Sequence, residues 1–551
     1  MLELRSFYVI GADLVLSSLP NGTARVVAVT AVGETFEAEI NAGARIDHLG
    51  AGTYCVQALG ANDEVLAEEF TTIGRHQGER PVHGFATSFS PEEVWSVLDW
   101  HRALRSTVVQ IYDWMASYTA PLGSSGQWKD PSNRPVSLKA LQALAAGLHE
   151  SGAVAHAYAP VYAVGNDFAS EHPEMLMYND EGKAIRFLDQ IVLANPGNAE
   201  WQRHFVASYG EAMDAVGFDG LHVDTYGYPR IAFDAEGTRL DIAEGYTSFL
   251  NFLRGERRTD LISFNQVNGV PSAVSLPDGP GFRYCEIWPP NTAWRHFEGL
   301  MDRSSGRSGL VGSVEERDPL IRGSIACYPP VWGIDKPSGL VEGVEREDAL
   351  RTVVLTEAIA TSIGSSALLY GDLTAALCDP YYPKHALLSK TEASTVLAWR
   401  RFALRCRDLF FEGEDTSWYE IGDENGSVGI ESPSPVSPEP LGESVFARVA
   451  HGENFIAVSV VDLTGSEKAS WMTSTKAGTV SSVTVRVLVD HPGNWRAEGA
   501  VLGLGDSRFT DIGARVVPHR QGRALEVQLP LVDGWSVLRL RRAQSIVGQR
   551  S

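Results

Sequence analysis

The sequence predicts a multidomain protein in which a central (β/α)8 TIM barrel is flanked by an N-terminal and a C-terminal antiparallel β-sandwich. Its 551 residues exceed what one hydrophobic core usually organises. From about residue 81 to residue 411, short apolar runs alternate with amphipathic helical segments, which is the pattern of a parallel α/β fold. On either side, β-rich runs are separated by turn residues. We therefore expect domains at residues 1–78, 79–411 and 412–551.

The first region is predicted to be a small antiparallel sandwich. Its β-rich runs are separated by Gly, Asn and Asp turns and cover residues 25–32, 35–40, 53–59 and 65–72. Residues 74–81 are polar and have no period, which predicts a linker. The alternating α/β pattern begins directly after it.

Eight candidate strands define the expected barrel. Helix starts are signalled at Ser90-Pro91-Glu92-Glu93, a capping box with proline at the first helical position, and near Ser137 and Asn198; the second helix should end at Gly152. The expected strands cover residues 83–87, 107–113, 153–158, 218–224, 261–267, 283–286, 323–328 and 367–372. Eight strands over roughly 300 residues fit a (β/α)8 barrel better than an open sheet, although the length alone also permits the latter.

The last region again has the pattern of an all-β domain. Its runs cover residues 445–449, 455–461, 483–489, 525–529 and 536–540. Residues 432–440 are too rich in proline for a helix or a central strand. We expect a C-terminal β-sandwich.

The composition excludes several classes of partner. The chain has 69 acidic against 46 basic residues, whereas a nucleic-acid surface needs clustered positive charge. No window is long and apolar enough for a membrane span, and the N-terminus lacks the features of a signal peptide; we expect a cytoplasmic protein, or a secreted one if the sequence is a mature or trimmed form. The five scattered cysteines include no Cys-x-x-Cys pair. We expect no metal and no cofactor, and the oligomeric state stays open.

Four carboxylates stand where predicted barrel strands end. They are Asp113, Asp224, Glu286 and Asp372. The active site of a barrel is built at the C-terminal ends of its strands, so these positions are candidates for chemistry. Two facing carboxylates suit glycosidic cleavage, in which one attacks the anomeric carbon and the other protonates the departing oxygen. The chain lacks Gly-x-Ser-x-Gly, Walker and Gly-x-Gly-x-x-Gly motifs.

Aromatic residues lie beside these carboxylates. They are Tyr112, Trp114, Tyr158, Tyr162, Trp288, Tyr381 and Tyr382. Taken one at a time, an aromatic is better explained as core, and a strand-end Asp is as often a helix cap or an ion-pair partner. Their convergence at four strand ends favours a sugar-binding site. Asn265, in the run 261–267, joins the candidate substrate-binding residues.

His222 lies two residues before Asp224 and shares its strand face. That spacing could belong to a barrel metallohydrolase. No neighbouring His-x-His motif or bridging lysine accompanies it, so we expect His222 to bond substrate hydroxyls or hold a carboxylate.

Together these motifs resemble glycoside hydrolase family 66, the dextranases and cycloisomaltooligosaccharide glucanotransferases. The resemblance spans the whole barrel, and five motifs in order are fairly specific. They are Tyr112-Asp113-Trp114-Met115, Ala157-Tyr158-Ala159-Pro160-Val161-Tyr162-Ala163, Gly217-Phe218-Asp219-Gly220-Leu221-His222-Val223-Asp224-Thr225-Tyr226-Gly227, Glu286-Ile287-Trp288-Pro289, and Gly371-Asp372 with Tyr381-Tyr382-Pro383.

The resemblance implies a retaining, metal-independent enzyme acting on α-1,6-linked glucans. It implies that Asp224 is the nucleophile and Glu286 the general acid/base, and that Asp113 and Asp372 grip the sugar in the −1 subsite. It also implies an immunoglobulin-like N-terminal domain. The cyclising members carry an additional module late in the barrel, and only about 85 residues separate Glu286 from Gly371, so hydrolysis is preferred.

Three alternatives remain open. One is a cycloisomaltooligosaccharide glucanotransferase or another transglycosylase. Another is a retaining α-glycosidase with a different α-glycan, because the strand that ends at Asp224 is similar to that of the α-amylase family; that family has Arg where this chain has His222. The third is a non-catalytic carbohydrate-binding protein, which the presence of both Asp224 and Glu286 disfavours.

Overall fold

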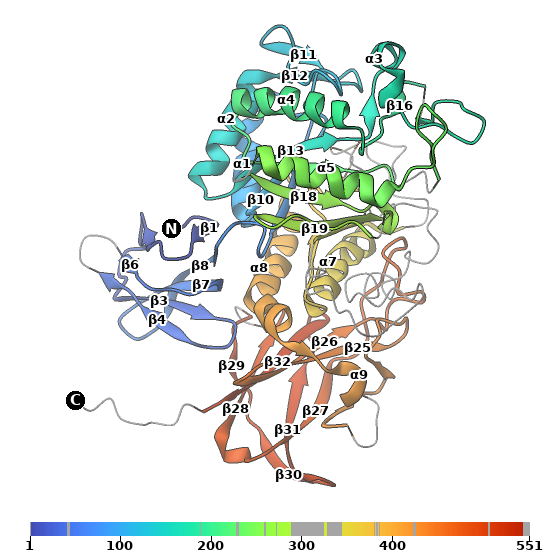
Figure 1. The fold of residues 1–551 in the computed structure, drawn as a ribbon. Helices are drawn as coiled ribbons and strands as arrows, with labels where there is room; N and C mark the ends of the chain where they lie inside the picture. The colour runs from blue at the N-terminus through green and yellow to red at the C-terminus, as the bar shows by residue number, and fades with distance from the viewer. Residues whose placement is uncertain are drawn as a thin grey trace.

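The computed structural model describes the chain except for residues 1, 41–43, 188, 228–230, 258–259, 272, 288–323, 328–343, 379–380, 382–383, 385, 422–425, 505–506 and 544–551. The candidates Trp288 and Tyr382 lie outside the described residues. Figure 1 shows two small N-terminal sheets, a central α/β region and a C-terminal group of sheets.

The central region contains one parallel sheet of eight strands. In sheet order these are β21 (Ser366–Leu368), β20 (Ser324–Cys327), β19 (Gly281–Ile287), β18 (Leu261–Asn265), β17 (Gly220–Asp224), β13 (Val154–Pro160), β10 (Val108–Ile111) and β9 (His83–Ala86). The two end strands, β21 and β9, contact each other, which is consistent with a (β/α)8 barrel. All eight predicted strands are confirmed, in order.

Helices cover the outside of this sheet (Figure 1). The longer ones are α1 (Val94–Ala103), α2 (Leu138–Glu150), α4 (Ala199–Val216), α5 (Ile242–Glu256), α7 (Arg346–Ser362) and α8 (Lys390–Glu412). Ser137 and Asn198 cap α2 and α4 as predicted, because their side-chain oxygens accept bonds from Ala140 N and from Glu200 N and Trp201 N. Gly152 follows α2 with φ +81°, which favours glycine.

The first helix begins later than predicted. The Glu93 carboxylate does reach back to the Ser90 backbone N–H, at 2.8 Å, but residues 91–93 form a turn and α1 starts at Val94. Only half of the predicted capping box forms, since the helix N-cap is Glu93 and has no side-chain cap bond.

Loops after two barrel strands carry small elements that the sequence did not reveal. These are the hairpin β11 (Gln127–Lys129) and β12 (Pro135–Ser137), the sheet of β14 (Ala163–Val164), β16 (Ile191–Leu193) and β15 (Arg186–Phe187), and helix α3 (Asn166–Glu171) with a 3-10 turn at Pro173–Met175. Another 3-10 turn, Val267–Gly269, follows β18. The strands are two or three residues long, too short for a period-2 pattern to be visible.

The N-terminal part forms two sheets over one apolar core. The larger contains β1 (Phe7–Val9), β8 (Val65–Gly74), β7 (Gly52–Leu59), β3 (Arg25–Thr30) and β4 (Thr35–Glu37), and the smaller β2 (Leu14–Leu16), β6 (Ala44–Ile46) and β5 (Glu39–Ile40). The strands predicted in this region are confirmed, except that the run 35–40 divides into β4 and β5. Since β8 extends through Gly74, the irregular segment begins at Arg75, one residue later than predicted.

The C-terminal part also forms two sheets. Their strands are β22 (Glu414–Asp415), β24 (Val436–Ser437), β25 (Val445–His451), β26 (Phe455–Asp462), β32 (Trp535–Arg542), β28 (Trp495–Val501) and β29 (Thr510–Asp511) in one sheet, and β23 (Val428–Glu431), β27 (Ser482–Val489), β31 (Gly522–Pro530) and β30 (Arg515–His519) in the other. Short helices lie at α9 (Ser417–Glu420) and Pro492–Asn494. All five predicted runs are confirmed. The flanking sheets are not wholly antiparallel as predicted, because β24 pairs with β25 in parallel here and β1 pairs with β8 in parallel in the N-terminal part.

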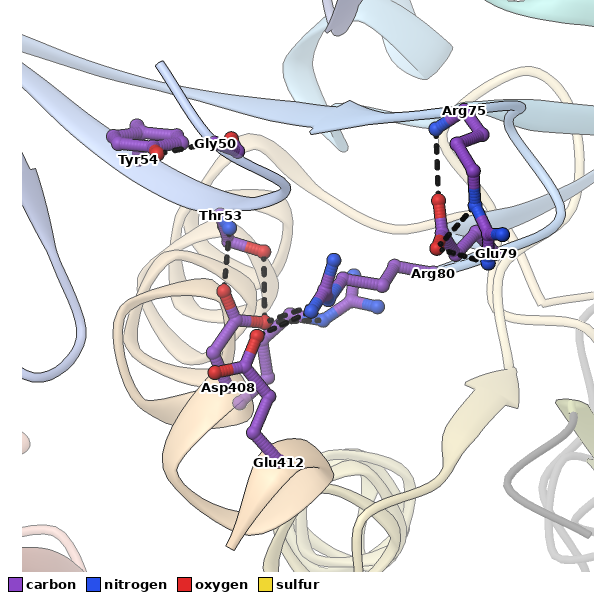
Figure 2. Close-up of polar contacts among 9 residues, drawn as sticks. Gly50, Thr53, Tyr54, Arg75, Glu79, Arg80, Asp408 and Glu412 are labelled. Atoms are coloured by element: carbon purple, nitrogen blue, oxygen red, sulfur yellow. Dashed lines mark hydrogen bonds and ion pairs between the residues drawn. The ribbon is translucent and has the colours of Figure 1, made fainter. Parts of the chain in front are cut away.

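Both flanking parts pack on the last two barrel helices. Apolar contacts join α8 to the C-terminal sheet, where the ring of Trp535 lies 6.0 Å from Trp399 and 4.6 Å from Phe402. On the N-terminal side a small apolar cluster that includes Phe70 and Leu404 is accompanied by polar contacts. Asp408 of α8 accepts bonds from the backbone N–H and the hydroxyl of Thr53, and Arg80 faces Asp408 and Glu412 (Figure 2). Among the described helices, none has the length and apolar character that a bilayer crossing requires.

Candidate active site

Three polar side chains end three neighbouring strands of the barrel sheet. Asp224 is the last residue of β17, Asn265 the last of β18, and Glu286 the last but one of β19. The strands are paired in parallel and in that order. Parallel strands present their carboxyl ends at the same edge, so the three side chains meet.

Asn265 joins the two carboxylates. Its Nδ2 donates to Asp224 Oδ1 at 2.7 Å and to Glu286 Oε2 at 2.9 Å. Its Oδ1 accepts from the Glu286 backbone N–H at 3.1 Å. Two carboxylate oxygens bound to one nitrogen cannot lie farther apart than the sum of the two bond lengths. The rim thus holds a close carboxylate pair.

Asp224 is buried and held by neutral donors. The Tyr158 hydroxyl donates to Asp224 Oδ2 at 2.8 Å, opposite the bond from Asn265. Burial raises the pKa of Asp224 well above its ordinary value, the charge of Glu286 raises it further, and the two hydrogen bonds oppose the shift. Two such close carboxyl groups titrate as a pair and favour the state with one proton and one negative charge.

Tyrosine rings line the region beside this pair. The ring of Tyr112 lies 4.2 Å from that of Tyr158 and 5.9 Å from that of Tyr381, and Tyr162 lies 5.8 Å from Tyr226. Tyr112, Tyr158 and Tyr162 are buried, whereas Tyr381 is 44% exposed. The exposed ring marks where this aromatic wall reaches solvent. Such faces can stack on the apolar C–H faces of sugars.

The other two strand-end carboxylates lie at the same edge. Asp113 accepts a bond from Arg134 at 2.6 Å, and the Thr87 backbone N–H donates to Asp372 Oδ2 at 3.0 Å. Burial raises the pKa of each to about 7, although Arg134 lowers that of Asp113 and the Thr87 N–H that of Asp372. Asp372 is fully buried, and no described donor reaches its Oδ1.

Strained backbone gathers at this edge. Ser88 after β9, Asp113 after β10, Asn268 after β18 and Leu373 after β21 have φ of 52°, 46°, 51° and 51°. Non-glycine residues rarely adopt this region, and such strain concentrates at functional sites, where the surrounding structure holds it. It adds an independent sign that this edge is the functional one.

Two predicted residues do not join the rim. Trp114 is fully buried, with its ring 4.9 Å from Phe218 and 6.1 Å from Tyr209 of α4, so it packs between sheet and helix as core. His222 lies below Asp224 on β17 and its Nδ1 bonds Ser263 Oγ at 2.8 Å, rather than a carboxylate. Within the described residues, no three His, Cys, Asp or Glu side chains are arranged to hold a metal ion.

Arg134 is the main site residue that the sequence did not reveal. It lies in the turn between β11 and β12 and pairs with both Asp113 and Asp130, at 2.6 and 2.7 Å. A lone Arg in a polar loop has no periodicity or motif that would single it out. Pairing with Asp113 is visible only once the hairpin folds over β10.

Comparisons with known proteins identify the family of this chain. The family model described as Glycosyl hydrolase family 66 matches residues 56–537. A cycloisomaltooligosaccharide glucanotransferase of Niallia circulans is 26% identical over 259 residues, 42% of this chain and 27% of that protein. A dextranase of Streptococcus salivarius is 25% identical over 382 residues, 63% of this chain and 46% of that protein. The matched segments thus span less than half of either relative.

The fold has a close counterpart among solved structures. The crystal structure of the Paenibacillus sp. cycloisomaltooligosaccharide glucanotransferase complexed with cycloisomaltoheptaose matches with a TM-score of 0.77, covering 98% of this chain and 99% of that chain. The sequence identity is 15%, so this likeness shows the fold alone. The family resemblance inferred from the sequence motifs is confirmed by the match over residues 56–537.

Proposed function

Because the chain belongs to glycosyl hydrolase family 66, we propose that it is a retaining glycoside hydrolase that cleaves α-1,6 linkages in dextran or isomaltooligosaccharides. Asp224 is the nucleophile and Glu286 the general acid/base. The curated relatives, a dextranase and a cycloisomaltooligosaccharide glucanotransferase, support this substrate class.

The carboxylate spacing is the observation that carries the mechanism. Asp224 Oδ1 and Glu286 Oε2 cannot lie farther apart than the sum of their 2.7 and 2.9 Å bonds to Asn265. Retaining pairs lie roughly 5–5.5 Å apart, whereas inverting pairs need roughly 6.5–9.5 Å to admit a water. This bound holds for the two facing oxygens and is close to the retaining spacing, which supports direct attack by a carboxylate.

In the first step, ionised Asp224 attacks the anomeric carbon while Glu286 gives its proton to the departing glycosidic oxygen. This forms a glycosyl ester on Asp224 and leaves Glu286 ionised. In the second step, Glu286 takes a proton from water, and the water oxygen displaces Asp224. Tyr158 and Asn265 orient Asp224 through its two oxygens.

The other rim residues bind the sugar. Asp113 and Asp372 accept hydroxyl hydrogens in the −1 subsite, and their places after β10 and β21, at the edge that holds Asp224 and Glu286, support this role. Substrate contacts also come from Tyr112, Tyr158, Tyr162 and Tyr381, and from Trp288 and Tyr382, which lie outside the described residues.

The sheets support a three-domain layout. An immunoglobulin-like sandwich at residues 1–78 precedes a catalytic (β/α)8 barrel at 79–411, and a β-sandwich at 412–551 completes the chain. The grouping of sheets within these ranges agrees with this division.

Transfer to a sugar acceptor is the second candidate activity. A glucanotransferase chain is matched over 99% of its length, so the short span between Glu286 and Gly371 does not separate hydrolysis from transfer. Both activities share the glycosyl ester and differ in whether water or a sugar hydroxyl attacks it.

The test is a substrate panel of dextran, isomaltooligosaccharides, starch and pullulan, with product lengths measured. We expect linear products from the first two and none from the others. Proton NMR of early products should show the α-anomer first, because two displacements restore the configuration. An early β-anomer would contradict the retaining mechanism, cyclic products would favour transfer, and activity on starch alone would reject the α-1,6 assignment.

A further inference from the structure

We propose that Asn265 is a positioning residue. Its amide stabilises the single negative charge of the Asp224–Glu286 pair in both steps of the reaction, first on Asp224 and then on Glu286. This inference rests on the proposed function. It assigns Asn265 to the carboxylate pair, where the sequence had suggested a contact with substrate. The argument depends on the bonding of one amide group at the end of β18.

The orientation of the Asn265 amide is determined by its surroundings. Nδ2 faces Asp224 Oδ1 and Glu286 Oε2, and Oδ1 faces the Glu286 backbone N–H. Turning the amide over would place its oxygen against two carboxylate oxygens and its NH2 against an N–H donor. The contacts with ionised Asp224 and with the Glu286 N–H would both become repulsive.

Both Nδ2 hydrogens are committed to carboxylates, and Asn265 is 1% exposed. Tyr158 takes the other oxygen of Asp224. A substrate hydroxyl that accepted a bond from Nδ2 would have to displace one of the two carboxylates. The bonding therefore favours a role within the pair over a contact with the sugar.

The reaction keeps one negative charge on this pair. Before the first step Asp224 is ionised and Glu286 protonated; after it, Asp224 is an uncharged ester and Glu286 is ionised. In each state one N–H of Asn265 meets an anion and the other a neutral oxygen acceptor. A neutral donor between the two groups serves both states, whereas a cation fixed on one carboxylate would favour only one of them.

The hydrogen bond from Asn265 Nδ2 also determines which oxygen of Glu286 holds the acid proton. Oε2 accepts from Asn265, so in the protonated acid Oε2 is the carbonyl-type oxygen and the hydrogen is on Oε1. Oε1 is then the atom that gives the proton to the departing oxygen and takes one from water.

The experiment compares the pH dependence of kcat/KM for wild type, Asn265→Asp and Asn265→Leu on an isomaltooligosaccharide. Each donor stabilises an ionised carboxylate, so losing both raises both pKa values of the pair. The acidic and the alkaline limbs of the kcat/KM profile should both shift to higher pH. The shift should be about one pH unit for Asn265→Leu and larger for Asn265→Asp, which adds a third carboxyl group. We expect kcat to fall about 10²-fold, with KM changed less than about threefold.

The matched control is Asn198→Asp, the same isosteric change at the N-cap of α4, where Asp caps equally well; its limbs and kcat should stay at wild-type values. Asn265→Asp keeps side-chain volume, so it tests the idea even if Asn265→Leu fails to fold. If the limbs of the pH profile stay in place and kcat is lower, Asn265 has only a structural role. If the limbs stay in place and KM is higher, Asn265 contacts substrate. Either result overturns the proposal. Failure of the proposed function is seen separately, as wild type inactive on α-1,6-glucans or releasing the β-anomer first.

Discussion

Two buried aspartates of this molecule are held by different kinds of partner. Asp408, where α8 meets the N-terminal sheet, accepts bonds from the backbone and hydroxyl of Thr53 and has Arg80 Nε at 3.7 Å (Figure 2). Asp224, at the barrel rim, is bound by the Tyr158 hydroxyl and the Asn265 amide. In the described part of the chain, Asp224 has no ion pair with Arg or Lys.

The difference reflects whether the charge is permanent. An arginine beside a buried carboxylate compensates its desolvation and fixes it as an anion. Asp408 joins two parts of the fold and has no reason to change its charge. Asp224 has to be an anion in one step and an ester in the next, so a permanent cation beside it would stabilise only the first state. Neutral donors tolerate both.

Asp113 combines features of Asp408 and Asp224. It is at the rim, yet Arg134 donates to it at 2.6 Å, and burial still raises its pKa to about 7. A carboxylate that accepts sugar hydroxyls forms no bond to the anomeric carbon, so a cation partner is compatible with binding although not with nucleophilic attack. The partners of Asp224 and Asp113 thus match the roles proposed for these two residues.

The largest expected effect is the loss of turnover in Asp224→Asn. The change keeps side-chain volume and removes the nucleophilic oxygen anion, so kcat should fall by about 10⁴-fold or more. Steady-state kinetics on dextran and calorimetric binding of an isomaltooligosaccharide measure the two consequences. Binding should survive and the unfolding midpoint should change little. Retention of more than about a tenth of wild-type kcat would reject Asp224 as nucleophile.

Asp408→Ala should show the opposite profile. The change removes the two carboxylate oxygens to which Thr53 donates. It also leaves the buried guanidinium of Arg80 with one carboxylate partner fewer. Together these losses should lower the free energy of unfolding by about 3 kcal/mol. Activity at denaturant concentrations below the unfolding transition should be unchanged. Asp408 contacts Thr53 and Arg80, and Arg80 precedes β9, whereas the rim lies beyond the other end of that strand. Denaturant unfolding and kcat on dextran are the two measurements. A variant as stable as wild type would show that this junction contributes nothing to the fold.

The barrel was predictable because its signals are local. Each parallel strand is a short, mainly apolar run, and this pattern located all eight strands. Asp224 ends β17 and Glu286 is the last residue but one of β19, so both were located with their strands. The caps of α2 and α4 were equally visible, since Ser137 and Asn198 stand directly before amphipathic segments. Signals of this kind depend on residues close in sequence.

What the sequence did not predict depends on contacts between distant residues. Arg134 meets Asp113 only because a short hairpin folds over β10. Trp114 adjoins a rim residue in sequence, but its ring packs against Tyr209 of α4. Asn265 was noted as polar at a strand end, whereas its bridging bonds required β17 and β19 to be placed on either side.

The smallest expected effect concerns Asp372 and sharpens the comparison further. Its carboxyl group is fully buried and its Oδ1 has no described donor, and burial raises its pKa from 3.8 to about 7. A raised folded-state pKa means that the folded protein holds the proton more tightly than the unfolded chain. The contribution of Asp372 to stability is then most favourable below about pH 4, declines as the pH rises and is constant above about pH 7. Asp372→Asn stays neutral and can still accept the Thr87 N–H, so it should match wild type near pH 4 and exceed it by roughly 2 kcal/mol at pH 5.5. Urea unfolding at both pH values measures this gap, with the exposed Asp99→Asn on α1 as a control that should show none. A gap of the same size at both pH values would mean that Asp372 is ionised throughout, and that the barrel rim holds its charges no differently from the junction at Asp408.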